Sequence, residues 1–342
     1  MKLEEPTAQS VAEAARLLRD GQLVAFPTET VYGLGGDATN ERAVAAIFEA
    51  KGRPEFNPLI SHVLGPDEAK RFVRWNDTAD KLAARFWPGP LTMVLPRSEN
   101  VHDVVTGGQD TVAIRVPSHP MAQQLLTAFG GGIAAPSANR FGRVSPTRAE
   151  HVREEFGDAV RVVLDGGEAQ IGLESTIVSF EGEQVRLLRP GFITYSQLKE
   201  VVGDVIVGAG AGVPRVPGAK VSHYAPLTPM SIVPVDEIDK RAEQLSEGGR
   251  RVAVLAMRLP LKTYPSVTWI NAGRRPDAFA HDLYSNLRAL DKAGCEQILV
   301  QDVPSDEKWT AIRDRLARGA AVGAAATEAD QFAETGGYSV LP

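Results

Sequence analysis

Leu23-Val24-Ala25-Phe26, followed directly by Pro27-Thr28-Glu29-Thr30-Val31-Tyr32-Gly33-Leu34-Gly35, is the stretch that decides the fold of this chain. Four successive apolar residues predict a buried strand, and the apolar spacing over residues 8–20 predicts a helix before it. Hydroxyls, one carboxylate and two glycines then crowd the loop after the strand. A helix, a buried strand and a polar loop in this order favour an α/β protein with ligand contacts at strand ends.

The same alternation continues along the first two thirds of the chain. Apolar runs predict strands at 59–63, 91–95, 112–116, 133–135, 160–164, 176–180 and 185–188. Helical spacing predicts helices from a cap at Asn40 to Lys51 and near 76–86, 119–129 and 147–155. Because no helix separates the strands near 175–188, that part is antiparallel. The predicted fold class is therefore α/β, with a mixed twisted sheet and flanking helices.

A Gly- and Pro-rich stretch from Gly208 to Gly218 separates this region from the remainder, and its composition is typical of a linker. Beyond Pro226, strands and helices alternate again, which predicts a smaller Rossmann-like module. We expect a catalytic domain at 1–205, a linker at 206–228 and an accessory domain at 229–342.

Composition limits the classes of function. The net charge is −6, and both halves of the chain, divided at Pro226, carry more Asp and Glu than Lys and Arg. This favours a small-molecule enzyme over a protein that grips nucleic acid. The single cysteine, Cys295, forms no internal disulfide, and neither a signal-peptide core nor a run of about 18 apolar residues occurs. We therefore expect a cytoplasmic protein that does not enter a membrane.

Three clusters could carry chemistry. The loop at 27–35 suits ligand contact, although it could equally be a strand-to-helix turn whose polar groups satisfy the backbone. In the second cluster, Lys51 and Arg53 flank a glycine and could hold phosphates, or could simply complement the end of a helix. Asn57 and His62 follow, and a histidine inside a strand is more often a core residue than a ligand.

The third cluster closes a predicted strand with Ala135-Pro136-Ser137-Ala138-Asn139. Ser137 and Asn139 lie two residues apart in extended chain and so project from the same side, although an Asn-containing turn is the alternative. Arg115 ends another predicted strand, where a buried guanidinium needs an anionic partner. A substrate carboxylate could be that partner.

Several familiar site motifs are missing from the sequence. It contains no Gly-x-x-x-x-Gly-Lys-Ser/Thr loop, no His-Glu-x-x-His and no Gly-x-Ser-x-Gly. ATP binding would therefore need another architecture, and covalent catalysis has no support from a nucleophile motif.

The order of the motifs resembles the YrdC-type threonylcarbamoyl-AMP synthases. The matching segments are PTETVYGLG (27–35), KGRP with NPLISH (51–62), DTVAIRVP (110–117), APSAN (135–139) and LESTIV (173–178). Longer members of that family also carry a His-Tyr-Ala-Pro linker element and a Rossmann-like C-terminal domain. Here His223-Tyr224-Ala225-Pro226 falls at the predicted boundary, so the resemblance covers nearly the whole chain.

The resemblance implies a nucleotidyltransferase. It would convert L-threonine, bicarbonate and ATP into L-threonylcarbamoyl-AMP and pyrophosphate, with Mg²⁺ bridged by phosphate oxygens and not held by protein side chains. A partner transferase complex would then pass the threonylcarbamoyl group to tRNA, so that stable direct tRNA binding by this chain is not expected.

The resemblance also implies which residues form the site. Around threonine it implies Thr30, His62, Arg115, Ser137 and Ser175. Around ATP it implies Lys51, Arg53, Asn57, Thr111, Ala135, Asn139, Ser145, Arg189 and, as a closing lid, Tyr224. Of these, Lys51, Arg53, Ser137 and Asn139 are expected to assist the chemistry.

One departure from the family concerns the linker. The family typically has Gly-Met-Lys-Tyr-Arg-His-Tyr-Ala-Pro, whereas this chain has Gly218-Ala-Lys-Val-Ser-His-Tyr-Ala-Pro226. The aromatic residue and the arginine before the histidine are missing, so linker contacts to the nucleotide are expected to be weaker or rearranged.

Two rival hypotheses remain at this stage. The arginines at 140, 143, 148 and 153 could contact RNA phosphates, although acidic residues at 150, 154 and 155 interleave with them. Alternatively, the same fold could transfer a carbamoyl group through an adenylate to another acceptor, as related domains of hydrogenase-maturation proteins do.

Overall fold

The computed structural model describes residues 2–4, 7–208, 212–218 and 224–321. By its internal contacts the chain divides into two compact units. The first comprises residues 1–141 and 145–219, and the second comprises residues 142–144 and 220–342. One boundary between the units lies within residues 206–228, and residues 142–144 also belong to the second unit.

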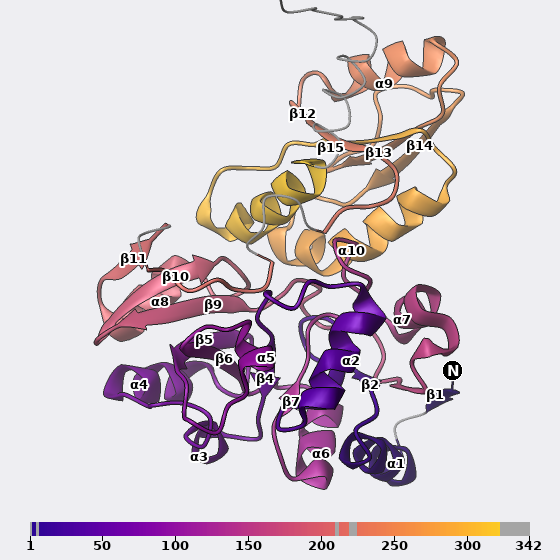
Figure 1. The fold of residues 1–342 in the computed structure, drawn as a ribbon. Helices are drawn as coiled ribbons and strands as arrows, with labels where there is room; N and C mark the ends of the chain where they lie inside the picture. Colours follow the sequence, from indigo (N-terminus) through magenta and orange to yellow (C-terminus); the bar gives the residue numbers. More distant parts are fainter. Residues whose placement is uncertain (1, 5–6, 209–211, 219–223, 322–342) are drawn as a thin grey trace, which may run out of the picture. The chain divides into compact units, whose positions relative to one another are not determined.

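The first unit is built on one sheet of 11 strands in the order β1-β8-β2-β3-β7-β4-β6-β5-β9-β10-β11 (Figure 1). The strands are β1 (Lys2–Glu4), β2 (Val24–Phe26), β3 (Gly33–Asp37), β4 (Ile60–His62), β5 (Leu91–Pro96), β6 (Thr111–Arg115), β7 (Ile133–Ala134), β8 (Val162–Leu164), β9 (Thr176–Glu181), β10 (Gln184–Arg189) and β11 (Val205–Val207). Strands far apart in sequence are neighbours, so the sheet brings the sequence motifs together.

Parallel and antiparallel pairs both occur, which confirms the predicted mixed sheet. β4 pairs with β6 and β5 with β9 in parallel, whereas β5 pairs with β6 and β9 with β10 in antiparallel fashion. The antiparallel β9–β10 pair is the one that the sequence indicated.

Helices flank this sheet. They are α1 (Ala8–Arg19), α2 (Glu41–Lys51), α3 (Pro66–Ala69), α4 (Asp77–Phe86), α5 (Asp103–Thr106), α6 (Pro120–Phe129), α7 (Ala149–Phe156) with a 3₁₀ turn at Gly157–Ala159, and α8 (Tyr195–Val202). The Asn40 side chain caps α2 as predicted, and Gly52 ends it in the left-handed region. Lys51 and Arg53 thus lie on either side of a sharp turn.

Residues 33–35 differ from the predicted loop at 27–35, because they belong to β3, which is antiparallel to β2. Glycine-rich sequence disfavours a strand, but here it permits close packing. A Cβ on Gly35 would lie 2.8 Å from both Ile133 and Phe26 side-chain atoms. The aromatic ring of Phe26 thus occupies the space that a side chain at Gly35 would fill.

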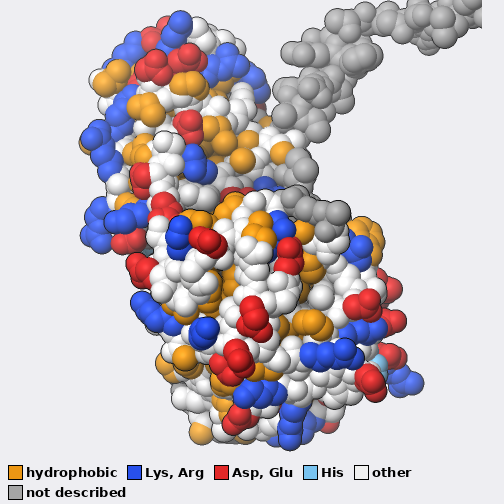
Figure 2. Space-filling model, turned by 90° about the vertical axis from the view of Figure 1, so that its left-hand side faces the viewer, with side chains coloured by type: hydrophobic (Ala, Val, Ile, Leu, Met, Phe, Trp, Pro, Cys, Tyr) orange, Lys and Arg blue, Asp and Glu red, His pale blue; other side chains and the backbone are white. Residues whose placement is uncertain are grey.

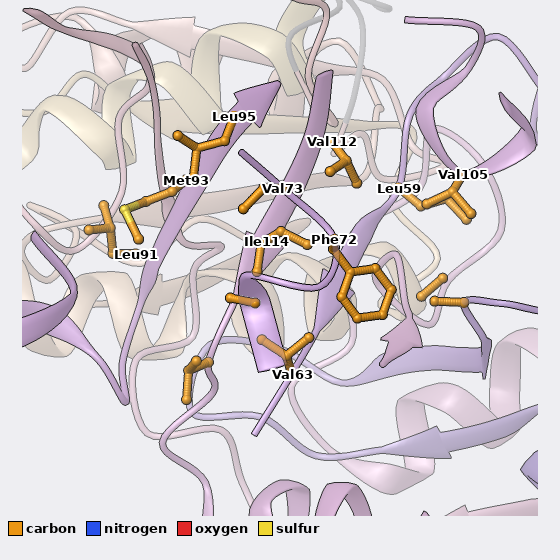
Figure 3. Close-up of a cluster of buried hydrophobic side chains, with 14 of the residues drawn as sticks. Leu59, Val63, Phe72, Val73, Leu91, Met93, Leu95, Val105, Val112 and Ile114 are labelled. Carbon is orange, nitrogen blue, oxygen red and sulfur yellow. The ribbon is translucent and has the colours of Figure 1, made fainter. Parts of the chain in front are cut away.

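The main hydrophobic core lies on one face of the strands around β5 and β6 (Figure 3). Leu91, Met93 and Leu95 project from β5 on the same side as Val112 and Ile114 of β6, and all five are buried. Since side chains alternate along a strand, the intervening residues of these strands face the other way. That second face carries the candidate site.

The second unit contains a four-stranded parallel sheet in the order β12-β15-β13-β14, formed by β12 (Met230–Val233), β13 (Val252–Ala256), β14 (Val267–Asn271) and β15 (Gln297–Gln301). Its helices are α9 (Ile238–Glu247), α10 (Pro276–Lys292) and a helix over residues 310–321 preceded by a 3₁₀ turn at Glu307–Trp309. This confirms the predicted Rossmann-like module. Among the described residues, no helix combines the length and hydropathy needed to span a membrane.

Gly191 provides a test of how the chain is packed near the start of β9. A Cβ at this position would lie 2.3 Å from the Thr176 backbone nitrogen and 2.6 Å from the Ser175 carbonyl carbon. We expect Gly191→Ala to lower the free energy of unfolding by about 3 kcal/mol, because backbone must move to admit the methyl group. Urea unfolding measures this.

Gly65→Ala is the matched control, since a Cβ there would meet nothing within 4 Å and the φ of Gly65 is −173°. We expect that substitution to change stability by less than about 1 kcal/mol. Equal effects of the two substitutions would contradict the packing around Gly191.

Candidate active site

A row of polar side chains crosses one face of the sheet. The strand register aligns His62 of β4 with Arg115 of β6, Arg115 with Thr92 of β5, and Thr92 with Ile177 of β9. A register shift in β10 then sets Arg189 opposite Ile177. Residues paired in this way share a face, and adjacent strands lie about 4.8 Å apart. Three residues predicted for the site therefore stand in one row.

The next row on the same face is apolar. Ile60, Ala113 and Val94 lie side by side on β4, β6 and β5, and they form a buried cluster with Ile177 and Val216. Val216 belongs to the predicted linker, so this part of the linker covers the sheet face beside the polar row.

Hydrogen bonds hold the linker segment in this place. The Arg215 guanidinium donates to the Gly107 carbonyl at 2.9 Å, and the Arg215 backbone N–H donates to the Gln109 side chain at 2.6 Å. Nη1 of Arg189 donates to the Pro217 carbonyl at 2.8 Å. One end of the polar row is thus tied directly to the linker.

The loop after β2 supplies buried hydroxyls and a carboxylate. Thr28 Oγ1 lies 2.8 Å from Thr30 Oγ1 and donates to the Val31 carbonyl. Glu29 accepts a hydrogen bond from the Ser118 backbone N–H at 3.1 Å. All three side chains of Thr28, Glu29 and Thr30 are buried. These residues do more than satisfy a local turn, because they also reach β6.

Arg115 is the residue on β6 that they reach. Its Nη1 donates to Thr30 Oγ1 at 2.9 Å, and its Nη2 lies 2.8 Å from Glu29 Oε1. Both side chains of the ion pair are at most 4% exposed. The sequence predicted that a buried guanidinium needs an anion, and the structure provides one within the chain.

His62 stands beside Arg115 and is held in its neutral form. Burial, with a smaller contribution from the nearby Arg115 charge, lowers the pKa of His62 to about 3. The Phe26 ring packs against it edge-on at 5.9 Å. Nδ1 of His62 is buried and has no hydrogen-bond partner in the described part of the chain. A neutral imidazole with an unused nitrogen is suited to contact a polar ligand.

Lys51 joins the second and third sequence clusters. Its ammonium donates to the Ser137 carbonyl at 2.6 Å and also to the Asn139 carbonyl. Burial, and then repulsion from Arg53, lowers the pKa of Lys51, while Glu155 opposes the shift. Lys51 is therefore not a solvated cation at a helix end, since it fixes the 135–139 loop.

The 135–139 loop also contacts the first cluster. Gly33 and Ser137 form an antiparallel bridge, and the Ala138 N–H donates to the Tyr32 carbonyl at 2.8 Å. The Ala135 N–H donates to the Ile60 carbonyl at 2.9 Å. Three of the motifs are therefore joined through backbone bonds.

The loop before β4 carries Arg53 and Asn57. The Arg53 guanidinium donates to the Pro58 carbonyl at 3.0 Å and lies over the Phe141 ring, with 5.9 Å to the ring centroid. Asn57 donates to the Pro54 carbonyl at 3.1 Å. Asn139, which is buried, donates to the Arg140 carbonyl at 2.7 Å.

The LESTIV segment completes the polar row. Ser175 Oγ lies 2.7 Å from Thr92 Oγ1 and 3.1 Å from Nη2 of Arg189. The preceding Glu174 accepts a hydrogen bond from Ser145 Oγ at 2.5 Å. Ser175 is therefore held from both sides, and it connects Thr92, the strand neighbour of Arg115, to Arg189.

Two predicted site residues lie apart from these contacts. Thr111 begins β6, and its Oγ1 is buried without a hydrogen-bond partner in the described ranges. Tyr224 belongs to the second unit, where it stacks on Tyr284 at 6.0 Å and lies below the Arg315 guanidinium at 5.1 Å. His223, the other key linker residue, lies outside the described residues.

Sequence reasoning did not single out three residues that support the site. Thr92 was hidden within an apolar strand, and only the strand register reveals that it faces Arg115. Glu174 adjoins Ser175 in the LESTIV segment, which was the available signal. Glu29 was noted within the first cluster but was given no role.

The charge distribution bears on the rival prediction of an RNA-binding surface. Figure 2 shows basic and acidic side chains interspersed on the face that it draws. Within the predicted basic series, Arg148 pairs with Glu168 at 2.9 Å, the Arg140 backbone N–H donates to the Glu155 carboxylate, and the Arg140 guanidinium donates to the Glu155 backbone carbonyl. These partners reduce the field that phosphates would meet.

The fold is a mixed-sheet α/β fold. The five sequence motifs meet around a buried row that contains Arg115 and Arg189, and this arrangement is typical of an enzyme that binds a small ligand. Residues 16–191 match the family model of Sua5, YciO and YrdC, described as "Telomere recombination". Residues 193–321 match a second family model, described as "Threonylcarbamoyl-AMP synthase, C-terminal domain". The chain belongs to the Sua5, YciO and YrdC family, in the long form that includes this C-terminal domain.

Relatives in two organisms cover nearly the full length. The threonylcarbamoyl-AMP synthase of Pyrococcus abyssi is 40% identical over 315 residues, which is 89% of this chain and 92% of the relative. That of Bacillus subtilis is 41% identical over 320 residues, covering 91% and 92% respectively. The crystal structure of P. abyssi Sua5 complexed with L-threonine matches with a TM-score of 0.87 and 37% identity, over 94% of this chain and 98% of that one.

The depressed pKa of His62 predicts a pH dependence of stability. The unfolded chain, with a pKa near 6.5, binds a proton as the pH falls below that value, whereas folded His62 does so only near pH 3. The free energy of unfolding therefore decreases as the pH is lowered through this window. The His62 contribution to this loss is about 2 kcal/mol between pH 6.5 and about pH 5. We expect His62→Gln to lose less stability over the same interval, as measured by urea unfolding. Equal losses in the two proteins would contradict a buried neutral imidazole.

Proposed function

We propose that this chain is a threonylcarbamoyl-AMP synthase, which joins L-threonine, bicarbonate and ATP with release of pyrophosphate. The observation that carries the proposal is the row of His62, Arg115 and Arg189, to which the five motifs are joined. The similarity to threonylcarbamoyl-AMP synthases over about nine tenths of the chain supports the same function.

Threonine binds at the Arg115 end of the row in this proposal. Thr30, His62 and Ser175 surround that end with neutral polar groups, and Arg115 supplies the charge for a carboxylate. The binding of L-threonine by the similar P. abyssi protein supports this assignment. Ser137, which forms a backbone bridge with Gly33, is also assigned to threonine.

ATP binds beside it, among groups that include Arg189 on one side of Arg115 and the 135–139 loop on the other. Lys51, Arg53 and Arg189 provide positive charge, and Asn57, Thr111, Asn139 and Ser145 provide neutral hydrogen-bonding groups. Ala135 contributes backbone contacts only. We further propose that Tyr224 and the linker segment around Val216 form a lid, which keeps water from a reactive mixed anhydride.

The chemistry then needs position and charge rather than a protein nucleophile. The threonine amine adds to the carbon of bicarbonate, water leaves, and the resulting carbamate oxygen attacks the α-phosphorus while the bond to pyrophosphate breaks. Lys51 and Arg53 stabilise the charge that grows on the departing pyrophosphate. Ser137 and Asn139 orient the reacting groups.

Mg²⁺ would accompany ATP and neutralise phosphate charge. The buried carboxylates near the row fit a metal held by phosphates rather than by side chains, since Glu29 contacts Arg115 and Glu174 accepts from Ser145. The product would pass to a transferase complex acting on tRNA.

The first test is whether pyrophosphate release requires all three substrates together. We expect release only when threonine, bicarbonate and ATP are all present, because the carbamate is the nucleophile. Release that does not depend on threonine would refute the proposed function.

The division of the site can be tested with two substitutions. We expect Arg115→Lys to raise the KM for threonine about tenfold or more with little effect on the KM for ATP, because lysine lacks the planar fork of donors. Lys51→Ala should lower kcat about 100-fold. Steady-state kinetics on pyrophosphate release measure both effects.

Arg42→Lys, at an exposed position of α2, is the matched control and should leave both constants unchanged. If both site substitutions lowered kcat and raised both KM values equally, the assignment of separate threonine and ATP ends would be wrong.

A further inference from the structure

Glu29 is a buried carboxylate to which the proposed reaction gives no role. Its side chain is 3% exposed, and Oε1 lies 2.8 Å from Nη2 of Arg115. Oε2 accepts from the Ser118 backbone N–H, so both carboxylate oxygens are fixed by the end of β6 and the residues that follow it. Burying the Glu29 carboxylate costs solvation free energy, and a turn that only needed to satisfy its own backbone would not need a buried carboxylate.

The contact leaves both groups able to meet a ligand. Glu29 Oε1 and Arg115 Nη2 are within ion-pair distance, but neither atom has a well-aligned hydrogen-bond partner in the described part of the chain. The guanidinium is oriented by Thr30 through its other terminal nitrogen. Because neither atom is saturated, Oε1 of Glu29 can accept a hydrogen bond from a molecule beside the pair, and Nη2 of Arg115 can donate one to it.

The other groups around the pair add no charge. Thr30, Thr92 and Ser175 are neutral, and burial keeps His62 neutral because its pKa falls to about 3. Nδ1 of His119, whose pKa is lowered by burial, accepts from the Met121 backbone N–H, so this ring is not a second cation competing for Glu29. The side chains in direct contact with the Glu29–Arg115 pair therefore add no charge to it, and the next cation, Arg189, is bonded to the Ser175 hydroxyl.

We infer that Glu29 is a specificity-determining residue: by pairing with Arg115 it gives the threonine subsite no net charge, so that the subsite takes a zwitterionic amino acid and rejects a simple carboxylate. This inference rests on the proposed function for the identity of the ligand. A zwitterion brings no net charge into a buried site, whereas a hydroxy acid brings one uncompensated negative charge. The preference is the ratio of the affinity for the zwitterion to the affinity for the hydroxy acid.

The test compares three ligands of nearly equal size. Threonine is the zwitterion, 3-hydroxybutyrate lacks the amine and is an anion, and threonine amide lacks the carboxylate and is a cation. Isothermal titration measures their binding to the full chain, and competition against threonine-dependent pyrophosphate release provides a second readout. The proteins are wild type, Glu29→Gln and Glu29→Asp.

Glu183→Gln is the matched control, because Glu183 is another carboxylate of the first unit that accepts from a backbone N–H, that of Thr78. We expect wild type and this control to bind threonine at least about tenfold more tightly than either analogue. In Glu29→Gln the preference for threonine over 3-hydroxybutyrate should fall about tenfold or more, while threonine amide binds still more weakly. The KM for ATP should not change.

Glu29→Asp separates charge from shape, since it keeps the carboxylate but shortens the side chain. We expect it to retain the preference for the zwitterion even where overall affinity falls. If Glu29→Asp and Glu29→Gln lost that preference equally, or if Glu29→Gln kept the wild-type preference, Glu29 would have a structural role only and the inference would be wrong.

The wild-type protein alone can also overturn the inference, which matters if Glu29→Gln does not fold. Wild-type protein that binds 3-hydroxybutyrate as tightly as threonine would refute it. Threonine turnover combined with that result would leave the proposed function intact. Failure of threonine to support pyrophosphate release would instead count against the proposed function.

Discussion

The burial of Arg115 is the constraint on which the rest of the site depends. A guanidinium removed from water needs an anion and hydrogen-bond acceptors, and in the loop after β2 Glu29 provides the anion and Thr30 provides an acceptor. This requirement fixes that loop against β6. Because β6 is flanked by β4 and β5, the same requirement determines which side chains stand next to the guanidinium. The site is thus organised around one cation rather than around a nucleophile or a metal-ligand set.

The remaining contacts connect this centre to the rest of the first unit. Thr92, the strand neighbour of Arg115, bonds to Ser175, Ser175 accepts from Arg189, and Arg189 in turn donates to the linker at Pro217. On the other side, Lys51 fixes the 135–139 loop through backbone carbonyls. One set of hydrogen bonds thus connects Thr92 through Ser175 and Arg189 to the linker, and a separate set holds the 135–139 loop.

The sequence was sufficient to predict most of this arrangement, for identifiable physical reasons. Apolar runs and helical spacing located the main strands and helices, and the order of five motifs indicated the family. It could not predict β3, because its glycines disfavour a strand unless Phe26 fills the space beside Gly35. Nor could it reveal the pairing of Glu29 with Arg115, which lie far apart in sequence and meet only because the loop after β2 folds back over β6. The placement of the predicted threonine and ATP residues around bound ligands stays a prediction.

The most direct test of the account is to follow carbon from bicarbonate into the product. The chain is incubated with threonine, ATP, Mg²⁺ and ¹³C-labelled bicarbonate, and the nucleotide products are analysed by mass spectrometry. The account predicts an AMP adduct of threonine that carries one labelled carbon and fails to form when threonine is omitted. An unlabelled adduct, or pyrophosphate release that yields only AMP, would contradict a site in which a threonine carbamate attacks the α-phosphorus.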